Sequence, residues 1–523
     1  MSAVHSRKRG RGRRPEMIQK PQGAIHPRVQ QVGPEHFGIL SVDCAKARSK
    51  WMLADFYGNV LVAPTQVEHN RPALELAVLL TREAMAQHEL RDVLVAIERT
   101  GRYHHPIKRA FQAAGFDVRI VHPFTTKRLR QPADPGTKTD DTDLAAIHRA
   151  AVNGFALGER PLDSSWRELQ LLVRQRRDLV RKTSLLCCQI KEHLEAALPG
   201  YAACFPKLWE HPAAMHLASA FGSVEALRAA SATALSARLR ADGIRFQQRT
   251  VERVREWSAR AAEADVAAAR QHRIAMALEA DRTVKTREIL ALEREIAALL
   301  VATDYVLLMS VPGINVVSAA ELAGEAGPIA NYANANCLKG RAGLYPSRYQ
   351  SDQVDLAGHL VRSANRQLRF AILLIADNLL LCNRHFGLKA QEWKLAGKDP
   401  RHTRVKVGAK FCRIAFQMLA GRQVFRHPSC QQPNCILAKL IEFHREHETP
   451  MDAVMADLHK ATAWIPQDEY GREAEPLAKE LERIQNRRRR GAISRLGDIL
   501  PVVLARLGVG AVQSSKSGEH DPH

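Results

Sequence analysis

Residues 37–121 alternate short apolar runs with segments of helical periodicity, and this alternation restricts the fold more than any other feature of the chain. Polar turns bound the apolar runs, which indicates strands, and the intervening segments have the spacing of amphipathic helices. The predicted elements are strands 37–43, 51–56 and 59–67, helix 71–87, strand 92–98, helix 103–114 and strand 118–121. A meander of three strands followed by alternating helices and strands is typical of a mixed α/β layer fold.

After residue 160 the pattern becomes helical and charged. Two leucine-rich series have the spacing of a and d positions in a heptad, which predicts a helical hairpin or coiled-coil packing; burial against the chain's own domains is the alternative. They are Leu172, Leu179 and Leu186 in the first series, and Ile289, Leu292, Ile296 and Leu299 in the second. The apolar run 370–382 is predicted to lie in a buried helix over 363–382, and another helix is predicted over 404–420.

The length of 523 residues suggests about three folding units. We expect an α/β domain followed by α-helical regions, with a tail at each end. The predicted divisions are a basic disordered tail over 1–34, the α/β domain over 35–158, a helical, coiled-coil-like region over 159–300, a mostly helical domain over 301–428, and a basic helical extension and tail over 429–523.

The chain carries 77 Lys and Arg against 55 Asp and Glu, a net charge of +22. Such a positive field suits a polyanionic partner, above all nucleic acid. Binding to a membrane surface is the weaker interpretation, because no apolar run reaches the roughly 20 residues that span a bilayer. The N-terminus lacks an apolar signal segment and the nine cysteines show no disulfide framework, which favours a reducing cytoplasm.

Two of the predicted strands end in a carboxylate, Asp43 and Glu98. If these strands are parallel neighbours, the carboxylates converge, because ligands gather at the carboxyl ends of parallel strands. Asp140 and Asp143 lie three apart, on one face of a predicted helix. These four acids could hold one or two Mg²⁺ ions. An acid in a first helical turn is also stabilised by the helix dipole alone, so a purely structural role is the alternative.

A second set of candidates lies in residues 309–372. The turn at Gly313 precedes a helix and could present N–H groups to a phosphate, although it could equally be an ordinary helix start. Ser351 lies in a predicted loop, where a serine is ordinarily a turn residue. Arg362, Arg366 and Arg369 are predicted to share one helical face that contacts phosphates, with a solvated basic face as the alternative.

Three blocks resemble the signature blocks of the DEDD insertion-sequence transposases, the insertion-sequence one-ten and eleven-eleven group: Phe37–Lys46, Val93–Gly101 and Lys138–Asp143. Residues 309–372 resemble the C-terminal transposase domain of that group. They share its Pro-Gly-Ile turn, its Gly-Leu-x-Pro segment, a serine five residues after that proline, and an Asn-Arg-x-Leu-Arg element at Asn365–Arg369. The chain departs from the group's pattern where glycine is usual, at Asn315, Asp352 and Ala364.

The resemblance implies a RuvC-like, RNase H-type N-terminal domain whose acids are Asp43, Glu98, Asp140 and Asp143, with Mg²⁺ or Mn²⁺ as cofactor. Asp141 is left outside the set by the spacing of the block. In the family the serine is the DNA nucleophile, and it maps to Ser351, with Ser347 as the neighbouring alternative.

The resemblance further implies a composite site formed between subunits of a homo-oligomer, a dimer or tetramer. The partners it implies are DNA, as element ends and target, and a structured guide RNA. The expected place is the bacterial cytoplasm at the nucleoid, with no membrane partner. A metal-dependent structure-specific nuclease, similar to a Holliday-junction resolvase, is the rival function; it would need the carboxylates but not Ser351. A non-catalytic basic nucleic-acid-binding protein would need neither.

Overall fold

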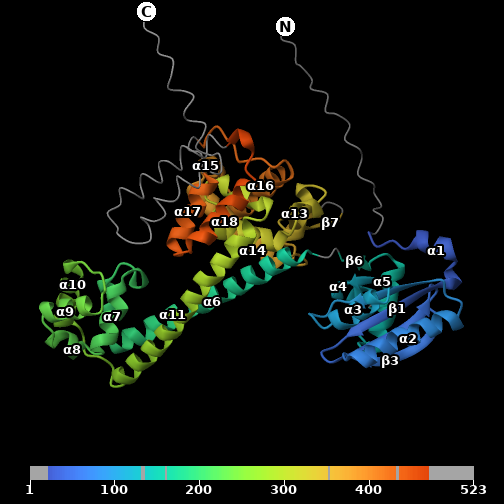
Figure 1. Ribbon diagram of the computed structural model, residues 1–523, viewed down its shortest axis with the longest axis horizontal. Helices are drawn as coiled ribbons and strands as arrows, with labels where there is room; N and C mark the ends of the chain where they lie inside the picture. Colours follow the sequence, from blue (N-terminus) through green and yellow to red (C-terminus); the bar gives the residue numbers. More distant parts are fainter. Residues whose placement is uncertain (1–21, 131–135, 160–161, 352–353, 431–434, 470–523) are drawn as a thin grey trace, which may run out of the picture. The chain divides into compact units, whose positions relative to one another are not determined.

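A computed structural model of the chain describes residues 22–130, 136–159, 162–351, 354–430 and 435–469. It divides into two compact units, Met1–Pro161 and Leu162–His523, where the length suggested three. The first unit holds a mixed sheet and the second is mostly helical (Figure 1), as the sequence predicted.

The first unit is built on a six-stranded sheet with the strand order β3-β2-β1-β4-β5-β6. β1 pairs antiparallel with β2 and parallel with β4, so the first and fourth strands are indeed parallel neighbours. The strands are β1 (Phe37–Cys44), β2 (Arg48–Asp55), β3 (Val60–Glu68), β4 (Asp92–Glu98), β5 (Asp117–Val121) and β6 (Leu157–Gly158). The sequence predicted all of these except β6, which has only two residues.

Helices cover both faces of this sheet. On one face, Leu40 and Val42 of β1 pack with α2 (Arg71–Gln87) and α3 (His105–Ala113). On the other face, Phe37 and Ile39 pack with α1 (His26–Val32), α4 (Pro123–Arg130) and α5 (Asp140–Val152). Because both faces are buried, β1 and β4 appear in the sequence as continuous apolar runs.

Helix α1 corrects the prediction of a disordered tail over residues 1–34. Ile25 is fully buried beneath the sheet, and Val29, one turn later, is buried with it. Arg28 donates a hydrogen bond of 2.8 Å to Asp92 and is ion-paired with Asp117. These apolar positions and Arg28 anchor the segment to the first unit. Residues 1–21 of the predicted tail lie outside the described residues.

In the second unit, two long helices lie side by side, α6 (Ser164–Ala197) and α11 (Ala268–Leu300) (Figure 1). Both leucine-rich series contribute buried side chains to these helices, among them Leu179, Leu186, Leu292 and Ile296. The helical hairpin that the heptad spacing predicted is therefore present.

Between the two long helices the chain forms a small helical subdomain that the sequence analysis did not resolve. Its elements are η2 (Tyr201–Cys204), η3 (Leu208–Glu210), α7 (Pro212–Phe221), α8 (Val224–Ala229), α9 (Ala232–Ala241) and α10 (Gln248–Arg260). It has a hydrophobic core of its own, centred on the buried ring of Tyr201, whose hydroxyl donates to the Ala214 carbonyl over 2.7 Å.

The remaining helices pack around one large core. They are η4 (Asp304–Ser310), α12 (Val316–Ala326), η5 (Ile329–Asn331), α13 (Ala335–Ala342), α14 (Arg366–Cys382), α15 (Arg384–Leu395), α16 (Pro400–Ala420), α17 (Ile436–Glu446), α18 (Met451–Thr462) and η6 (Gln467–Glu469). Ile436, Leu440 and Leu458 belong to the same core as α12 and α14. A domain boundary at residue 428 is therefore not seen; residues 470–523 of the predicted extension lie outside the described part of the chain.

A β-hairpin stands between α13 and α14, where the sequence predicted a loop. Its strands are β7 (Pro346–Ser351) and β8 (Val354–Leu360), and every side chain of β7 is exposed. Ser351 is thus the last residue of a strand rather than a loop residue.

Within the described ranges, no single helix is long and apolar enough to cross a membrane; only the pair α14 and α15, bent by 91°, passes that test together. The apolar run 370–382 is largely buried in α14, as predicted, but Phe370 and Leu381 are exposed.

Candidate active site

The first carboxylate pair is positioned by strand register. Val42 pairs with Ile97 in the parallel ladder, so Asp43 and Glu98 are the next residues on neighbouring strands. Alternate residues of a strand face the same side of the sheet. Asp43 follows Phe37 and Ile39 in this alternation, and Glu98 follows Leu94 and Ala96, all of which face α5. Both carboxylates therefore lie on the α5 side of the sheet.

The second pair begins α5. Thr139 is the N-cap, and its side chain and that of Thr142 form a reciprocal capping box with bonds of 3.2 and 3.0 Å. Asp140 is the first helical residue and is exposed, whereas Asp143 is buried. The helix dipole favours both charges. Capping thus sets the start of α5 so that Asp143 turns toward the sheet.

The electrostatics couple these acids to one another. Burial raises the pKa of Asp43, and the charges of Asp143 and Asp140 raise it further. Burial likewise raises the pKa of Glu98, while the Thr126 hydroxyl opposes this and the charge of Asp43 adds to it. Lys138 lowers both values. The four acids predicted from the sequence therefore form one negatively charged cluster, with Lys138 as a basic neighbour that the sequence analysis did not assign.

Two cations hold acids of this segment. Arg130, the last residue of α4, is ion-paired with Asp143. Lys50 of β2 is ion-paired with Asp141 over 2.6 Å, so Asp141 is engaged at the edge of the cluster. Arg130 was not predicted as a site residue; its only signal in the sequence is its place in a basic run shortly before the acidic block.

The chemistry of the cluster suits a hard divalent cation, because carboxylate oxygens are the ligands Mg²⁺ prefers and their mutual repulsion would be relieved by it. The geometry fits only in part. Among the residues that the structure describes, no three His, Cys, Asp or Glu side chains are close enough to hold one metal ion. Asp143 would have to exchange Arg130 for the metal.

The serine candidates differ in their surroundings. The Ser347 hydroxyl donates to the carbonyl of His359 over 3.1 Å and lies against Gly358, so it is part of the hairpin's own structure. Ser351 is exposed at the end of β7. Asp352, the departure beside it, lies outside the described residues. The exposed hydroxyl of Ser351 is therefore the freer of the two.

The three arginines predicted to share a helical face do not do so. Arg362 precedes α14, which begins at Arg366. The Arg369 guanidinium donates to the Ala342 carbonyl over 2.8 Å and also to the Val361 carbonyl. These carbonyls flank the two ends of the β7–β8 hairpin, so Arg369 clamps its base. Arg362 and Arg366 are the exposed members of the predicted set.

The turn at Gly313 packs closely against α14. Gly313 has φ +95°, and a side chain there would approach the Asn378 carbonyl to within 2.9 Å. Lys439 of α17 donates to the carbonyls of Met309, Val311 and Ile314. The turn lines a cleft of about 860 Å³ at the start of α12. Asn315, another departure from the family pattern, is the N-cap of that helix, a role asparagine fills better than glycine.

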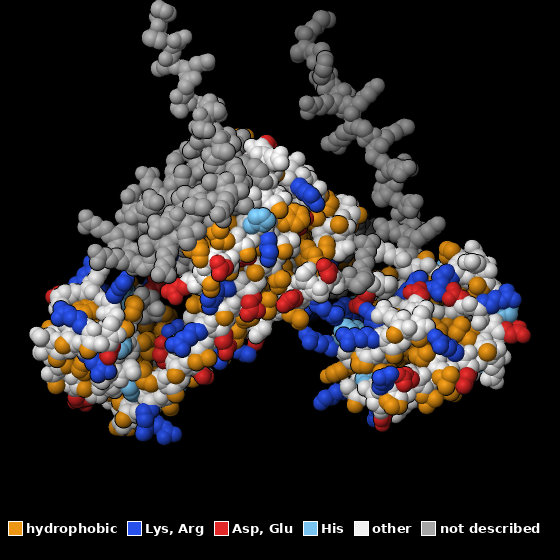
Figure 2. Space-filling view, in the orientation of Figure 1, with side chains coloured by type: hydrophobic (Ala, Val, Ile, Leu, Met, Phe, Trp, Pro, Cys, Tyr) orange, Lys and Arg blue, Asp and Glu red, His pale blue; other side chains and the backbone are white. Residues whose placement is uncertain are grey.

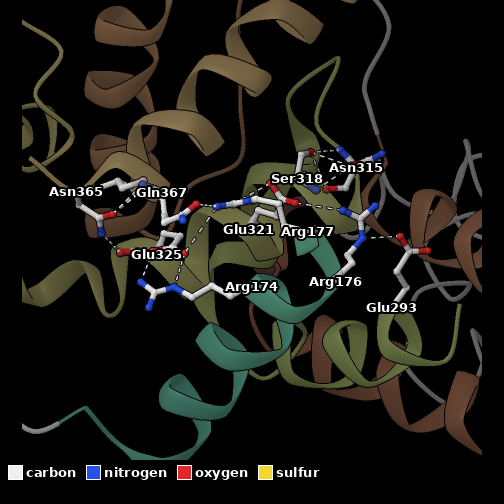
Figure 3. Close-up of polar contacts among 11 residues, drawn as sticks. Arg174, Arg176, Arg177, Glu293, Asn315, Ser318, Glu321, Glu325, Asn365 and Gln367 are labelled. Atoms are coloured by element: carbon white, nitrogen blue, oxygen red, sulfur yellow. Dashed lines mark hydrogen bonds and ion pairs between the residues drawn. The ribbon is translucent and has the colours of Figure 1, made fainter. Parts of the chain in front are cut away.

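A buried ionic network ties α6 to the C-terminal core (Figure 3). Arg174 binds Glu325 through two bonds of 2.8 Å, and Arg176 binds both Glu293 and Glu321. Burial raises the pKa of Glu293, but contacts with His447 and Arg176 outweigh it and hold that pKa below its usual range. The network extends to the Asn365–Arg369 element at the start of α14. Arg177 donates to Gln367, and Asn365 donates to the Glu325 carbonyl over 3.5 Å.

Comparisons with known proteins match both halves of this arrangement. Residues 40–199 match a DEDD transposase family of the IS110 type, described as a transposase, and residues 305–391 match the family described as "Transposase IS116/IS110/IS902 family". A protein of Streptomyces coelicolor, named "Insertion element IS110 uncharacterized 43.6 kDa protein", is 29% identical over 309 residues, which are 58% of this chain and 76% of that protein. The matched segments contain the four acids and Ser351.

Proposed function

We propose that the chain is an insertion-sequence transposase of the IS110 type, which its matches support, and that it moves its element by Mg²⁺-dependent cleavage and rejoining of DNA, with Ser351 as the nucleophile. The observation that carries this proposal is the convergence of Asp43 and Glu98 on one face of neighbouring parallel strands, opposite the acidic start of α5. The strand order β3-β2-β1-β4-β5 supports an RNase H-type fold for this unit.

Asp43, Glu98, Asp140 and Asp143 would hold the metal. Mg²⁺ bound there would supply charge stabilisation for phosphoryl transfer. The half-buried position of Asp43 and Glu98 keeps their charges unscreened by bulk water, so they can fix a cation firmly. Lys127 and Arg128, the exposed basic residues of α4, would meet the DNA backbone next to these acids. Figure 2 shows Lys and Arg side chains over α3 and α4 on the face in view.

Ser351 would attack a DNA phosphorus through its side-chain oxygen. A new oxygen–phosphorus bond forms, the bond from phosphorus to one deoxyribose oxygen breaks, and the serine proton leaves to a base so that the released DNA end becomes a hydroxyl. One phosphodiester replaces another, so a second DNA hydroxyl can attack the phosphoserine and rejoin a strand without an external energy source. The exposed place of Ser351 at the end of β7 supports this role.

The acids and the serine lie in different compact units. We include in the proposal that the two halves of one active site come from different subunits of a homo-oligomer, and that a structured guide RNA selects donor and target DNA. Both rest on the resemblance to this family. Sequencing of RNA that co-purifies with the protein, followed by a recombination assay with that RNA, tests the guide.

A trapped covalent adduct tests the chemistry. Wild-type protein incubated with Mg²⁺ and nicked or mismatched element-end DNA should remain attached to a strand after denaturation, and proteolysis should place the strand on a peptide containing Ser351. Ser351→Ala should bind DNA but form no adduct, whereas the matched Ser347→Ala should still form it. Cleavage without any adduct in the wild type would instead support the resolvase-like nuclease.

A further inference from the structure

A strongly basic segment of the described second unit forms two helices to which neither matched family segment assigns a role. Residues 384–413, which form α15 and most of α16, contain nine Lys and Arg but only two Asp and Glu. The family match ends at residue 391, so all of α16 lies beyond it. This surface is also separate from Gly313, Arg362, Arg366 and Arg369, the residues first predicted to contact nucleic acid.

The charges are arranged around one aromatic ring. Lys406 and Lys410 of α16 place their ammonium groups 5.6 and 5.9 Å from the ring centre of Trp393 on α15. Both distances are within the range of cation–π attraction. Lys406, Lys410 and Arg413 are spaced by four and three residues, which puts them on one face of α16. The Trp393 ring therefore holds the ammonium groups of Lys406 and Lys410 next to each other on one face of α16.

Most of these cations have no anionic partner. Three of the nine pair with a carboxylate, in the pairs Lys389–Glu392, Arg401–Asp399 and Arg404–Asp377. Within the described part of the chain the other six show no such ion pair: Arg384, Lys394, Lys398, Lys406, Lys410 and Arg413. Lys398 also lies close enough to Lys406 to lower its pKa, an effect second to that of desolvation. Positively charged side chains that lie close together without carboxylate partners are typical of a surface that binds an anionic partner.

We propose that the α15–α16 surface, centred on Lys398, Lys406 and Lys410, binds the phosphodiester backbone of duplex DNA. This rests on the proposed function only in taking DNA as the substrate. Phosphates supply the missing anions, and four residues of helix rise by roughly 6 Å, which lets successive lysines meet successive phosphates of one strand. Lysine amines contact phosphates without reading bases, so the surface adds affinity without sequence preference.

A lipid surface fits these helices less well. Leu388 and Leu395 of α15 are exposed, as a membrane-binding helix would require. However, no large apolar side chain is exposed among the described residues from 396 to 469, so α16 offers cations alone. A rigid polyanion that contacts both helices matches this distribution.

The test measures how the dissociation constant for a 30-base-pair duplex depends on salt, with full-length protein in EDTA so that the DNA stays intact. The triple variant Lys398→Gln, Lys406→Gln and Lys410→Gln should reduce the slope of log Kd against log salt by about two to three, because each lost phosphate contact releases about 0.9 fewer counterions. The matched control Lys182→Gln, Lys191→Gln and Lys207→Gln removes the same charge from exposed sites on α6 and beyond and should change the slope by less than about one.

Equal reductions in both triples would overturn the proposal, because the effect would then be one of net charge. It would also be overturned if the α15–α16 triple left DNA binding unchanged and weakened only binding to duplex RNA of the same length, or to vesicles containing anionic phosphatidylglycerol. As a readout that does not depend on folding of a variant, amine-reactive labelling of the wild type should show Lys398, Lys406 and Lys410 protected by DNA and Lys191 unprotected. If the proposed catalytic function is wrong but this inference is right, DNA cleavage or the covalent adduct will be absent while the α15–α16 surface still binds duplex DNA.

Discussion

Arg130 at the end of α4 is ion-paired with Asp143 in the first turn of α5, with side-chain exposures of only 13% and 8%. Asp143 is also one of the charges that raise the pKa of Asp43 and Glu98. Arg130 therefore neutralises the buried member of the acidic cluster, and it occupies the carboxylate that a metal ion would need.

Replacing Arg130 by glutamine should separate stability from metal binding. In the absence of Mg²⁺ the variant should lose about 3 kcal/mol of unfolding free energy, since Asp143 becomes an unpaired buried charge. Its affinity for Mg²⁺ or Mn²⁺ should rise, because Asp143 is then free to bind the ion. Urea denaturation with and without Mg²⁺, together with titration calorimetry, measures both effects.

Lys50→Gln is the matched control, because it breaks the neighbouring pair with the exposed Asp141. It should change stability by less than about 1 kcal/mol, as exposed ion pairs contribute little. An unchanged metal affinity in Arg130→Gln would contradict the idea that this arginine competes with the ion.

Asp43→Asn and Glu98→Gln should abolish DNA cleavage and yet stabilise the metal-free protein at pH 7. Folding raises the pKa of both carboxyls, so their favourable contribution is present at low pH and is lost as the pH rises through the folded values. The neutral amides remove that loss. Thermal unfolding in EDTA should show a higher Tm for each variant at pH 7, with the gain shrinking at acidic pH. A lower Tm at pH 7 would count against a repulsive cluster.

Arg369→Ala should loosen the hairpin that bears Ser351. The guanidinium joins the carbonyls at the two ends of this hairpin, and a two-stranded hairpin is only marginally stable alone. Hydrogen exchange over residues 346–360 should become faster, and adduct formation should fall more than tenfold while DNA affinity changes little. Arg366→Ala, an exposed neighbour on the same helix, should leave exchange unchanged. Equal exchange in both variants would exclude the clamp.

Glu321→Gln should destabilise the second unit strongly. Its carboxylate, 2% exposed, accepts from Arg176 over 3.1 Å and Arg177 over 3.3 Å. Losing its charge leaves two buried guanidinium groups short of a partner, at a cost of about 3–5 kcal/mol. Glu295→Gln on the exposed side of α11 should change unfolding by less than about 0.5 kcal/mol. Chemical denaturation followed by circular dichroism measures the difference.

Asp457 of α18 gives a prediction about pH. Burial raises its pKa to about 6, and the side chain lies 3.5 Å from His444. Its contribution to stability is therefore present below its usual value of 3.8 and is lost as the pH rises through about 6. Asp457→Asn should be more stable than the wild type at pH 7, by at most about 3 kcal/mol, and should match it near pH 4. A variant less stable at pH 7 would show that the ionised carboxylate is favourable.

The sequence predicted the first unit well because local patterning determines it. Buried strands such as β1 and β4 are continuous apolar runs, and Asp43 and Glu98 lie at their carboxyl ends, so position along the chain was enough to place these two acids. The pairing of Asp143 with Arg130 could not be predicted, because it depends on how α4 packs against α5 after an intervening segment of irregular sequence.

The second unit was predicted less completely because its contacts are long-range. The prediction that Arg362, Arg366 and Arg369 share one helical face was wrong, because α14 begins later than the periodicity suggested. In addition, the side chain of Arg369 turns inward and donates to two backbone carbonyls. Ser351 was placed in a loop because exposed strands such as β7 lack the apolar alternation that marks a strand. Nothing local marks Lys439 as the residue that fixes the turn at Gly313, 126 positions away in the chain.

The ionic network of α6 has a consequence for the order in which the protein is made. Arg174 and Glu325 are separated by 151 residues. At ribosomal rates of roughly 5–20 residues per second, the partner emerges roughly 8–30 seconds after the arginine. During that time α6 presents uncompensated guanidinium groups and the apolar side chains of Leu169 and Val173 to solvent, while the α7–α10 subdomain can already pack its own core. Nascent chains are therefore most vulnerable to aggregation and most in need of chaperones between the completion of α6 and the synthesis of α12.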